Sequence, residues 1–172
     1  MFYIVRHGEP DYSEINTKIY KGFGSNMCPL TEKGKSQIKE TAKDLRLHNA
    51  EIIISSPYVR ALQTAAILSK ELGLDIIVET DLHEWLANKN YIHEEDSIAD
   101  ENYNQFHENN GCYPLGEEKD WETFEMMKSR ALAVLEKYKD YKNVIVTCHG
   151  MLIEAITGQH HPKHGEIIQF EL

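Results

Sequence analysis

The chain has few cysteines, fewer basic than acidic residues and no long apolar run, and each shortage disfavours a class of protein. Its three cysteines form no C-x-x-C pair, so we expect a reduced, cytoplasmic protein. Eighteen Lys and Arg against 28 Asp and Glu give a net charge of −10, which disfavours nucleic acid or an anionic membrane as partner, because both require a basic surface. No apolar run approaches the roughly 18 residues of a membrane-spanning helix, and Arg6 interrupts the stretch where a secretory signal would lie.

Most of the acidic excess lies in one segment. Residues 86–120 hold nine acidic and two basic side chains, and no arginine. This stretch shows no sustained helical or strand period, so we expect a long loop with at most a short helix, a feature that is usually functional or disordered. The chain has no internal repeat or low-complexity linker. It is therefore expected to form a single domain over residues 1–172, with 86–120 as an acidic lid or insertion.

Elsewhere, short apolar runs alternate with amphipathic stretches. The runs cover residues 2–5, 52–54, 76–78 and 144–146, all typical of buried strands, and 167–170, a final strand. Apolar helical faces are formed by Ile38, Ala42 and Leu45, by Ala61, Ala65, Leu68 and Leu72, and by Phe124, Met127, Ala131, Val134 and Tyr138. Thr31 and Asp120 are expected N-caps, Gly73 a C-terminal cap, and a short fourth helix begins near Gly150. The alternation predicts an α/β fold of three layers with a mostly parallel central sheet.

Polar residues follow three of the predicted strands. Arg6 and His7 follow the first strand, Arg60 lies on the first turn of the helix after the second, and His149 follows the fourth. Because the carboxyl ends of parallel strands meet at one edge of the sheet, we expect these four residues to converge there. Two arginines, two imidazoles and nearby helix N-termini form an anion site, most simply for a phosphoryl group, and an imidazole in such a site can act as a nucleophile.

These residues lie in blocks that resemble the histidine phosphatase (phosphoglycerate-mutase-like) superfamily, in its short phosphatase branch. In chain order the blocks are R-H-G-E at 6–9, P-L-T-E-K-G at 29–34, S-S-P at 55–57, R-A-L-Q-T-A at 60–65, L-H-E at 82–84 and H-G at 149–150. Together they span nearly the whole chain. The resemblance implies a phosphoglycerate-mutase-like fold.

The resemblance also implies a role for each site residue. His7 is the nucleophile that takes up the phosphoryl group, and Arg6, Arg60 and His149 hold its equatorial oxygens. Glu84 donates a proton to the leaving oxygen and later activates water. No metal and no other cofactor is implied, because the arginines already supply the positive field.

Three further expectations concern a phosphate ligand, the identity of the acid and a possible metal site. Family members commonly place a polar residue, often Asn, six positions after the nucleophile, and Ser13 stands there as a candidate phosphate ligand. Glu79 and Asp81 compete with Glu84 for the role of acid, and the Leu-x-Glu context favours Glu84. His160, His161 and His164 resemble a metal cluster, but Pro162 is expected to place them in a loop, without the i, i+4 geometry of a helical metal site, so we expect no metal there.

The favoured function is a phosphomonoesterase that acts on a small phosphorylated metabolite through phosphohistidine. A phosphoglycerate-type mutase needs basic residues in its insertion to hold a second acidic group, and 86–120 has no arginine. A phosphohistidine protein phosphatase and a catalytically silent phosphate-binding module remain alternatives, although retention of His7 and Glu84 counts against the silent module. Short family members often hydrolyse α-ribazole phosphate, which is the specific substrate we name. The expected partner is thus a small phosphomonoester, and the oligomeric state is not indicated.

The charge of the segment 86–120 leads to a further hypothesis. Without this segment the chain is close to neutral, and Arg6 and Arg60 make the site locally positive. An acidic lid over such a site is expected to disfavour bisphosphates and other polyanions, and to favour substrates whose only strong charge is the scissile phosphate.

Overall fold

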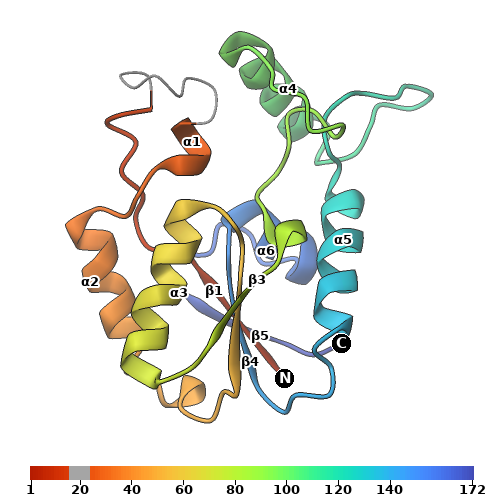
Figure 1. The fold of residues 1–172 in the computed structure, drawn as a ribbon. Coiled ribbons are helices and arrows are strands. Elements are labelled where there is room, and N and C mark those ends of the chain that lie inside the picture. The colour runs from red at the N-terminus through yellow and green to blue at the C-terminus, as the bar shows by residue number, and fades with distance from the viewer. Residues whose placement is uncertain (16–23) are drawn as a thin grey trace.

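The computed structural model describes residues 1–15 and 24–172, and these residues form one five-stranded sheet (Figure 1). The strands are β1 (Phe2–Arg6), β2 (Ile52–Ser55), β3 (Ile76–Val78), β4 (Val144–Cys148) and β5 (Ile167–Phe170). Their order across the sheet is β3-β2-β4-β1-β5. All neighbouring strands are parallel except β1 and β5, which are antiparallel. The carboxyl ends of β1, β2 and β4 therefore lie at the same edge.

Helices cover both faces of this sheet, which confirms the predicted three-layer α/β fold. The helices are α1 (Gly24–Met27), α2 (Glu32–Thr41), α3 (Val59–Leu72), α4 (Asp96–Glu108), α5 (Phe124–Glu136) and α6 (Gly150–Thr157). Figure 1 shows α2 and α3 on one face and α5 and α6 on the other. Alternate residues of β4 divide between the two cores, with Val144 and Val146 in the core beneath α5 and α6 and Ile145 in the core beneath α2 and α3.

The expected caps are confirmed at two helices and wrong at a third. The Thr31 side chain accepts the N–H of Gly34 and begins α2, and Gly73, with a φ of 71°, ends α3 in the left-handed conformation. For α5 the N-cap is Thr123 instead of Asp120, since the Thr123 side chain accepts the N–H of Met126. The cap therefore lies three residues after the predicted one.

Leu45 and Tyr138 lie outside the helices for which they were predicted, and Ala42 is the C-cap residue of α2. The Asp44 side chain accepts the N–H of Arg46 and starts a separate 3₁₀ helix, Leu45–Leu47, so Leu45 is 77% exposed and Leu47 takes the buried position. Tyr138 follows the last residue of α5 in a turn, where its hydroxyl donates to Oε1 of Glu79 at 2.6 Å. Its ring is nevertheless buried.

The run 76–78 is a strand, but the expectation that it is buried is wrong. β3 lies at the edge of the sheet, where Ile77 is 39% and Val78 51% exposed. An edge strand has a sheet neighbour on one side only, so its apolar residues remain partly in contact with water.

The acidic segment 86–120 contains a longer helix than expected. Helix α4 has 13 residues and lies above the carboxyl edge of the sheet (Figure 1). Phe106 is its buried residue and contacts the rings of Trp85, Trp121 and Phe124. Within residues 1–15 and 24–172, every helix is too short or too polar to cross a bilayer.

Candidate active site

His7 is buried directly after β1, and its two ring nitrogens have different partners. Nδ1 lies 2.7 Å from the carbonyl oxygen of Gly8, so this nitrogen carries the proton and donates it. The Arg60 Nε–H group donates to Nε2 at 3.2 Å. An arginine has no acceptor, so Nε2 must be the unprotonated nitrogen. The two contacts fix the tautomer, and the lone pair of Nε2 points toward Arg60.

The electrostatic environment keeps this imidazole neutral. Burial lowers the pKa of His7 to about 3, and the positive charge of Arg60 adds to the effect. The Gly8 carbonyl, which stabilises the protonated ring, acts in the opposite direction. At neutral pH Nε2 of His7 is therefore unprotonated, and its lone pair accepts the N–H of Arg60.

Close approach of two backbone segments requires glycine at Gly8, next to His7, and at Gly34 on α2. A Cβ atom at Gly8 would lie 2.6 Å from the carbonyl oxygen of Gly34, and one at Gly34 would lie 2.3 Å from the carbonyl oxygen of Glu9. The loop after β1 thus packs directly on the first turn of α2. The same loop is tied to α3, because the Gly8 N–H donates to the hydroxyl of Thr64 at 3.2 Å.

The two arginines are held in place by backbone carbonyls. Nη1 of Arg60 donates to the carbonyl of Ser25 at 2.6 Å, and Nη1 of Arg6 donates to the carbonyl of Pro162 at 2.5 Å. Arg60 is buried on the first turn of α3, as predicted. Nε of Arg6 is also buried and has no hydrogen-bond partner among the described residues.

His149 lies at the end of β4, where it is the N-cap residue of α6. Its ring centroid is 5.3 Å from that of His7, and its Nε2 lies 2.7 Å from the hydroxyl of Ser56. Burial lowers the pKa of His149 well below its usual value, so the ring is neutral. Its Nδ1 is buried and finds no hydrogen-bond partner among the described residues. A phosphoryl oxygen bound in this site would offer an acceptor for such a group.

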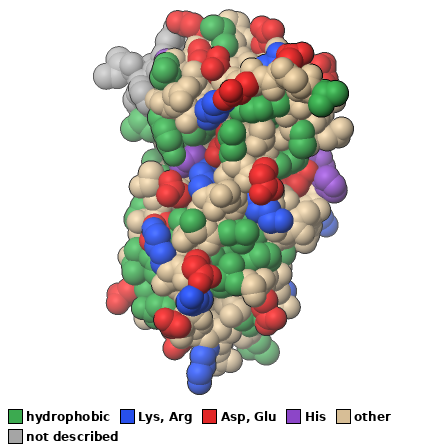
Figure 2. All heavy atoms as spheres, turned by 90° about the vertical axis from the view of Figure 1, so that its right-hand side faces the viewer, with side chains coloured by type: hydrophobic (Ala, Val, Ile, Leu, Met, Phe, Trp, Pro, Cys, Tyr) green, Lys and Arg blue, Asp and Glu red, His purple; other side chains and the backbone are tan. Residues whose placement is uncertain are grey.

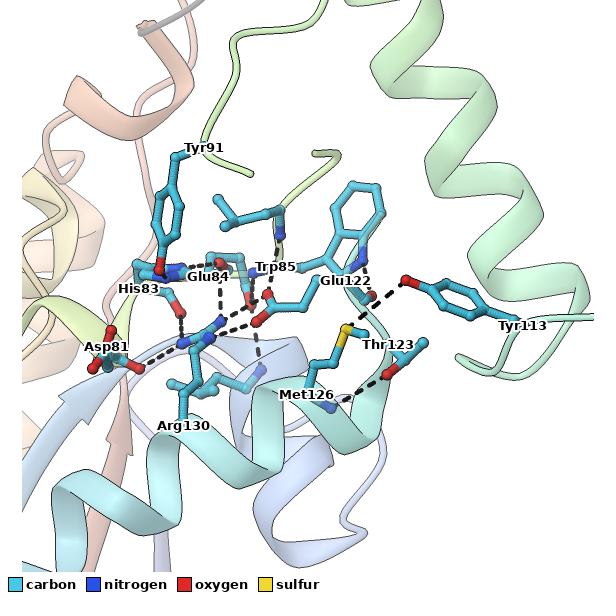
Figure 3. Close-up of polar contacts among 12 residues, drawn as sticks. Asp81, His83, Glu84, Trp85, Tyr91, Tyr113, Glu122, Thr123, Met126 and Arg130 are labelled. Carbon is cyan, nitrogen blue, oxygen red and sulfur yellow. Dashed lines mark hydrogen bonds and ion pairs between the residues drawn. The ribbon is translucent and has the colours of Figure 1, made fainter. Parts of the chain in front are cut away.

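Glu84 follows a short 3₁₀ helix, Thr80–Leu82, and its carboxylate points toward the start of α6 (Figure 3). Oε1 accepts the N–H groups of Trp85 at 3.1 Å and of Leu152 at 3.3 Å. Burial raises the pKa of Glu84, while the charge of Arg60 and these backbone donors lower it. Since burial is the largest effect, the carboxyl group holds a proton at a higher pH than an exposed glutamate does.

Most of these groups line a cavity of about 350 Å³, whereas His149 is fully buried behind His7 and is not part of the lining. Of the predicted site residues, its lining includes His7, Arg6, Arg60 and Glu84. Sequence reasoning missed Tyr12 in the loop after β1 and Ser25 and Asn26 on α1, whereas Tyr103 and His107 belong to the segment expected to form a lid. Polar residues on the segments 11–15 and 24–28 were the only available signal, and no spacing rule connects them to the strand ends.

Ser13 is not brought to this cavity. It is exposed, and both its N–H and its hydroxyl donate to Oδ1 of Asp11, at 3.0 and 2.6 Å. Tyr12 lines the cavity in its place. This placement does not support a role for Ser13 as a phosphate ligand, and that role stays a prediction.

A second cavity, also about 350 Å³, adjoins the first and lies beneath the acidic segment 86–120. The residues common to both linings are Ser25, Asn26 and Trp85. Tyr58 and Tyr91 add aromatic surface. Among the described residues that line it, Glu94 and Asp96 are acidic and none is a lysine or arginine.

The histidine-rich stretch 160–164 lies next to the site without forming a metal cluster. Nδ1 of His160 is 2.6 Å from Oε1 of Glu154, and the ring of His164 is 5.5 Å from that of His7. In the part of the chain that the structure describes, no three His, Cys, Asp or Glu side chains are grouped so that they could hold a metal ion.

The cavity has the charge distribution of a phosphoryl-transfer site. Guanidinium groups offset the charge of a bound phosphoryl group, and a neutral imidazole beside them keeps the lone pair that attacks it. The chain belongs to the histidine phosphatase superfamily, since the model of branch 1 of this family matches residues 2–169.

Comparison with known proteins agrees with this family. The chain is 30% identical over 156 residues to an uncharacterized phosphatase PhoE of Bacillus subtilis, which covers 89% of this chain and 73% of that protein. It is 28% identical over 160 residues to a probable phosphoglycerate mutase GpmB of Escherichia coli, which covers 90% and 71%. The fold matches that of Bacillus stearothermophilus YhfR with a TM-score of 0.70 at 20% identity, over 96% of this chain and 88% of that one.

Proposed function

We propose that this protein is a phosphomonoesterase that hydrolyses a small phosphorylated metabolite through a phosphohistidine intermediate on His7. The observation that carries the proposal is the state of the His7 ring. Gly8 holds the proton on Nδ1, burial keeps the ring neutral, and the lone pair of Nε2 accepts, among the described residues, only the N–H of Arg60, which a bound phosphoryl oxygen would take over. A histidine with only a structural role would not need both a fixed tautomer and a neutral ring next to two arginines.

The reaction has two steps. In the first, the lone pair of His7 Nε2 forms a bond to phosphorus, the bond from phosphorus to the leaving oxygen breaks, and the Glu84 carboxyl group gives its proton to that oxygen. In the second, the Glu84 carboxylate takes a proton from water, whose oxygen bonds to phosphorus as the P–N bond breaks. Arg6, Arg60 and His149 donate hydrogen bonds to the phosphoryl oxygens in both steps. The arginines supply the positive charge, so no metal is needed.

The lining of the second cavity favours hydrolysis over a mutase reaction. A phosphoglycerate-type mutase must hold a substrate with a second acidic group while the phosphoryl group returns to it. Glu94 and Asp96 would repel such a group, and no lysine or arginine among the described lining residues would attract it. We therefore propose that segment 86–120 is a lid whose charge favours a leaving group without a second anionic group. α-Ribazole phosphate, a monoester of this kind, is the specific candidate to assay.

The proposal is tested by phosphate release from 4-nitrophenyl phosphate. We expect activity of the wild-type protein in the presence of a chelator, loss of activity in His7→Ala, and normal activity in His48→Ala, which changes an exposed histidine outside the site. Acid-labile phosphate on the wild-type protein but not on His7→Ala would identify the intermediate. Activity in His7→Ala would contradict the proposed nucleophile. Loss of wild-type activity in chelator would contradict the metal-independent reaction, and absence of any hydrolysis would favour the silent phosphate-binding module.

A further inference from the structure

Arg130 on α5 holds the backbone of the segment that carries Glu84. Its Nη1 donates to the carbonyls of Asp81 at 2.5 Å and of His83 at 2.9 Å, and its Nη2 donates to the carbonyl of Glu84 at 3.3 Å. Figure 3 shows the guanidinium group pointing from the helix into this turn. One rigid, planar group thus contacts three carbonyls around the proposed acid, an arrangement that a flexible lysine cannot reproduce.

The same guanidinium group forms a buried ion pair with Glu122. Nε of Arg130 lies 2.6 Å from Oε1 of Glu122, and Nη2 lies 3.0 Å from Oε2. The two side chains are only 12% and 6% exposed. A buried pair of this kind contributes little net stability, but it fixes geometry strictly, because neither charge can leave its partner without a large desolvation cost.

Glu122 extends this contact to the residues that follow Glu84. Its carbonyl accepts the indole N–H of Trp85 at 2.7 Å, and its Oε2 accepts the N–H of Leu86 at 3.3 Å. Its own N–H donates to the carbonyl of Leu86 at 3.0 Å. Leu86 opens the acidic segment and Glu122 follows its end, so the base of the segment and the proposed acid are held by the same pair of side chains.

The carboxyl group of Glu84 is therefore fixed from two sides. The start of α6 contacts its oxygen through Leu152, and the Arg130–Glu122 pair holds the backbone behind it. Neither Arg130 nor Glu122 lines the catalytic cavity, so neither is placed to touch a substrate there.

We infer that Arg130 and Glu122 are positioning residues that set the location of the Glu84 carboxyl group against the leaving oxygen. This inference rests on the proposed role of Glu84 as general acid. Displacement of a catalytic group by about 1 Å can lower a rate roughly 100-fold. The effect of losing the pair should consequently depend on how much the leaving group needs a proton.

Leaving-group dependence separates this role from a purely structural one. An alkoxide is a poor leaving group and requires protonation, whereas 4-nitrophenolate leaves readily without it. A misplaced Glu84 should slow hydrolysis of glycerol 2-phosphate far more than hydrolysis of 4-nitrophenyl phosphate. A variant that is merely less folded has fewer active molecules and loses the same factor on both substrates.

The experiment compares Arg130→Lys and Glu122→Gln with two matched controls. Arg46→Lys makes the same change in an ion pair with Asp44 outside the site, and Glu118→Gln removes a lid ion pair with Lys89 that does not touch the Glu84 segment. For each protein, kcat and KM are measured on both substrates and Tm is recorded. Glu122→Gln keeps the shape of the side chain, so it tests the inference even where Arg130→Lys folds poorly.

We expect both test variants to lose about 10- to 100-fold in kcat on glycerol 2-phosphate and less than about threefold on 4-nitrophenyl phosphate. The controls should leave the ratio of the two rates unchanged. Equal losses on both substrates, or an unchanged ratio in Glu122→Gln, would overturn the inference. Wild-type protein that hydrolyses neither substrate, or a Glu84→Gln variant without leaving-group dependence, would instead contradict the proposed function.

Discussion

At the scale of single residues, the protonation states of His7 and Glu84 determine when the proposed first step can occur. His7 must be neutral to attack, and its pKa is lowered to about 3. Glu84 must be protonated to act as acid, and burial raises its pKa. The rate should therefore fall in acid only as the pH approaches about 3. It should fall in alkali as the pH rises through the elevated pKa of Glu84.

Glu84→Gln tests the origin of the alkaline fall in rate, the alkaline limb of the pH profile; the fall in acid is its acid limb. An amide holds no transferable proton, so we expect kcat to fall roughly 10²–10⁴-fold, with a larger loss for glycerol 2-phosphate than for 4-nitrophenyl phosphate. The alkaline limb of the kcat profile measured for the wild-type protein should disappear in the variant. Asp81→Asn, an exposed carboxylate three residues earlier, is the matched control and should keep both limbs. A profile that Glu84→Gln leaves unchanged would assign the acid to another group.

The position of a residue along the chain decides whether its place in the site could be predicted. His7, Arg60 and His149 lie directly after a strand or on the first turn of the next helix, and strand order alone brings them together. Arg130 contacts carbonyls 46 to 49 positions away, and no sequence rule gives such a pairing. One signal was available, because Arg130 interrupts the buried face of α5 between Met127 and Val134.

At the scale of secondary-structure elements, the length of the helix in the acidic segment is the largest departure from the sequence analysis, which expected at most a short helix there. An amphipathic pattern is visible only where several apolar residues share a face. Helix α4 buries one large apolar residue, Phe106, while Ile98 and Tyr103 are each 44% exposed. A polar contact adds to the docking, since the side-chain amide of Asn102 donates to the carbonyl of Ala87 at 2.9 Å. Aromatic contacts from other segments thus stabilise a helix whose own apolar face is small and buries a single residue.

The cap of α5 gives a prediction at this scale. Thr123→Ala removes the acceptor for the N–H of Met126, which should lower the free energy of unfolding by about 1 kcal/mol. For a domain of this size that loss corresponds to a decrease in Tm of roughly 2–4 °C. Asp120→Ala, at the exposed position that the sequence favoured, should change stability by less than about 0.5 kcal/mol. Denaturant unfolding of both variants measures the difference, and the reverse order would return the cap to Asp120.

At the scale of the whole molecule, the sequence predicted the layers and the edge of the sheet that holds the site. Five apolar runs became the five strands of the described sheet, because β-branched runs bounded by polar residues have few alternatives to a buried sheet. Burial of individual residues was less predictable, as the exposure of Val78 on the edge strand β3 shows. Strand order decides which runs lie at an edge, and strand order depends on contacts between distant segments.

The distribution of charge over the molecule leads to the last prediction. Figure 2 shows acidic side chains on the upper part of one face, interspersed with basic ones, and both signs of charge below. In the cavity beneath segment 86–120, Glu94 and Asp96 should repel a second anionic group on a substrate. Replacing both, as Glu94→Gln and Asp96→Asn, should therefore raise kcat/KM for 2,3-bisphosphoglycerate relative to phosphoethanolamine by about 3- to 10-fold.

The control for this prediction removes the same charge from the same segment but away from the cavity. Glu101→Gln with Glu108→Gln neutralises two residues of α4 that line neither cavity, so the substrate ratio should change less than about twofold. Glu94 accepts a hydrogen bond from Asn88, and glutamine preserves an acceptor for it. An equal shift in test and control variants would attribute selectivity to the net charge of the protein. An unchanged ratio in the test variant would show that the acidic segment does not select substrates by charge.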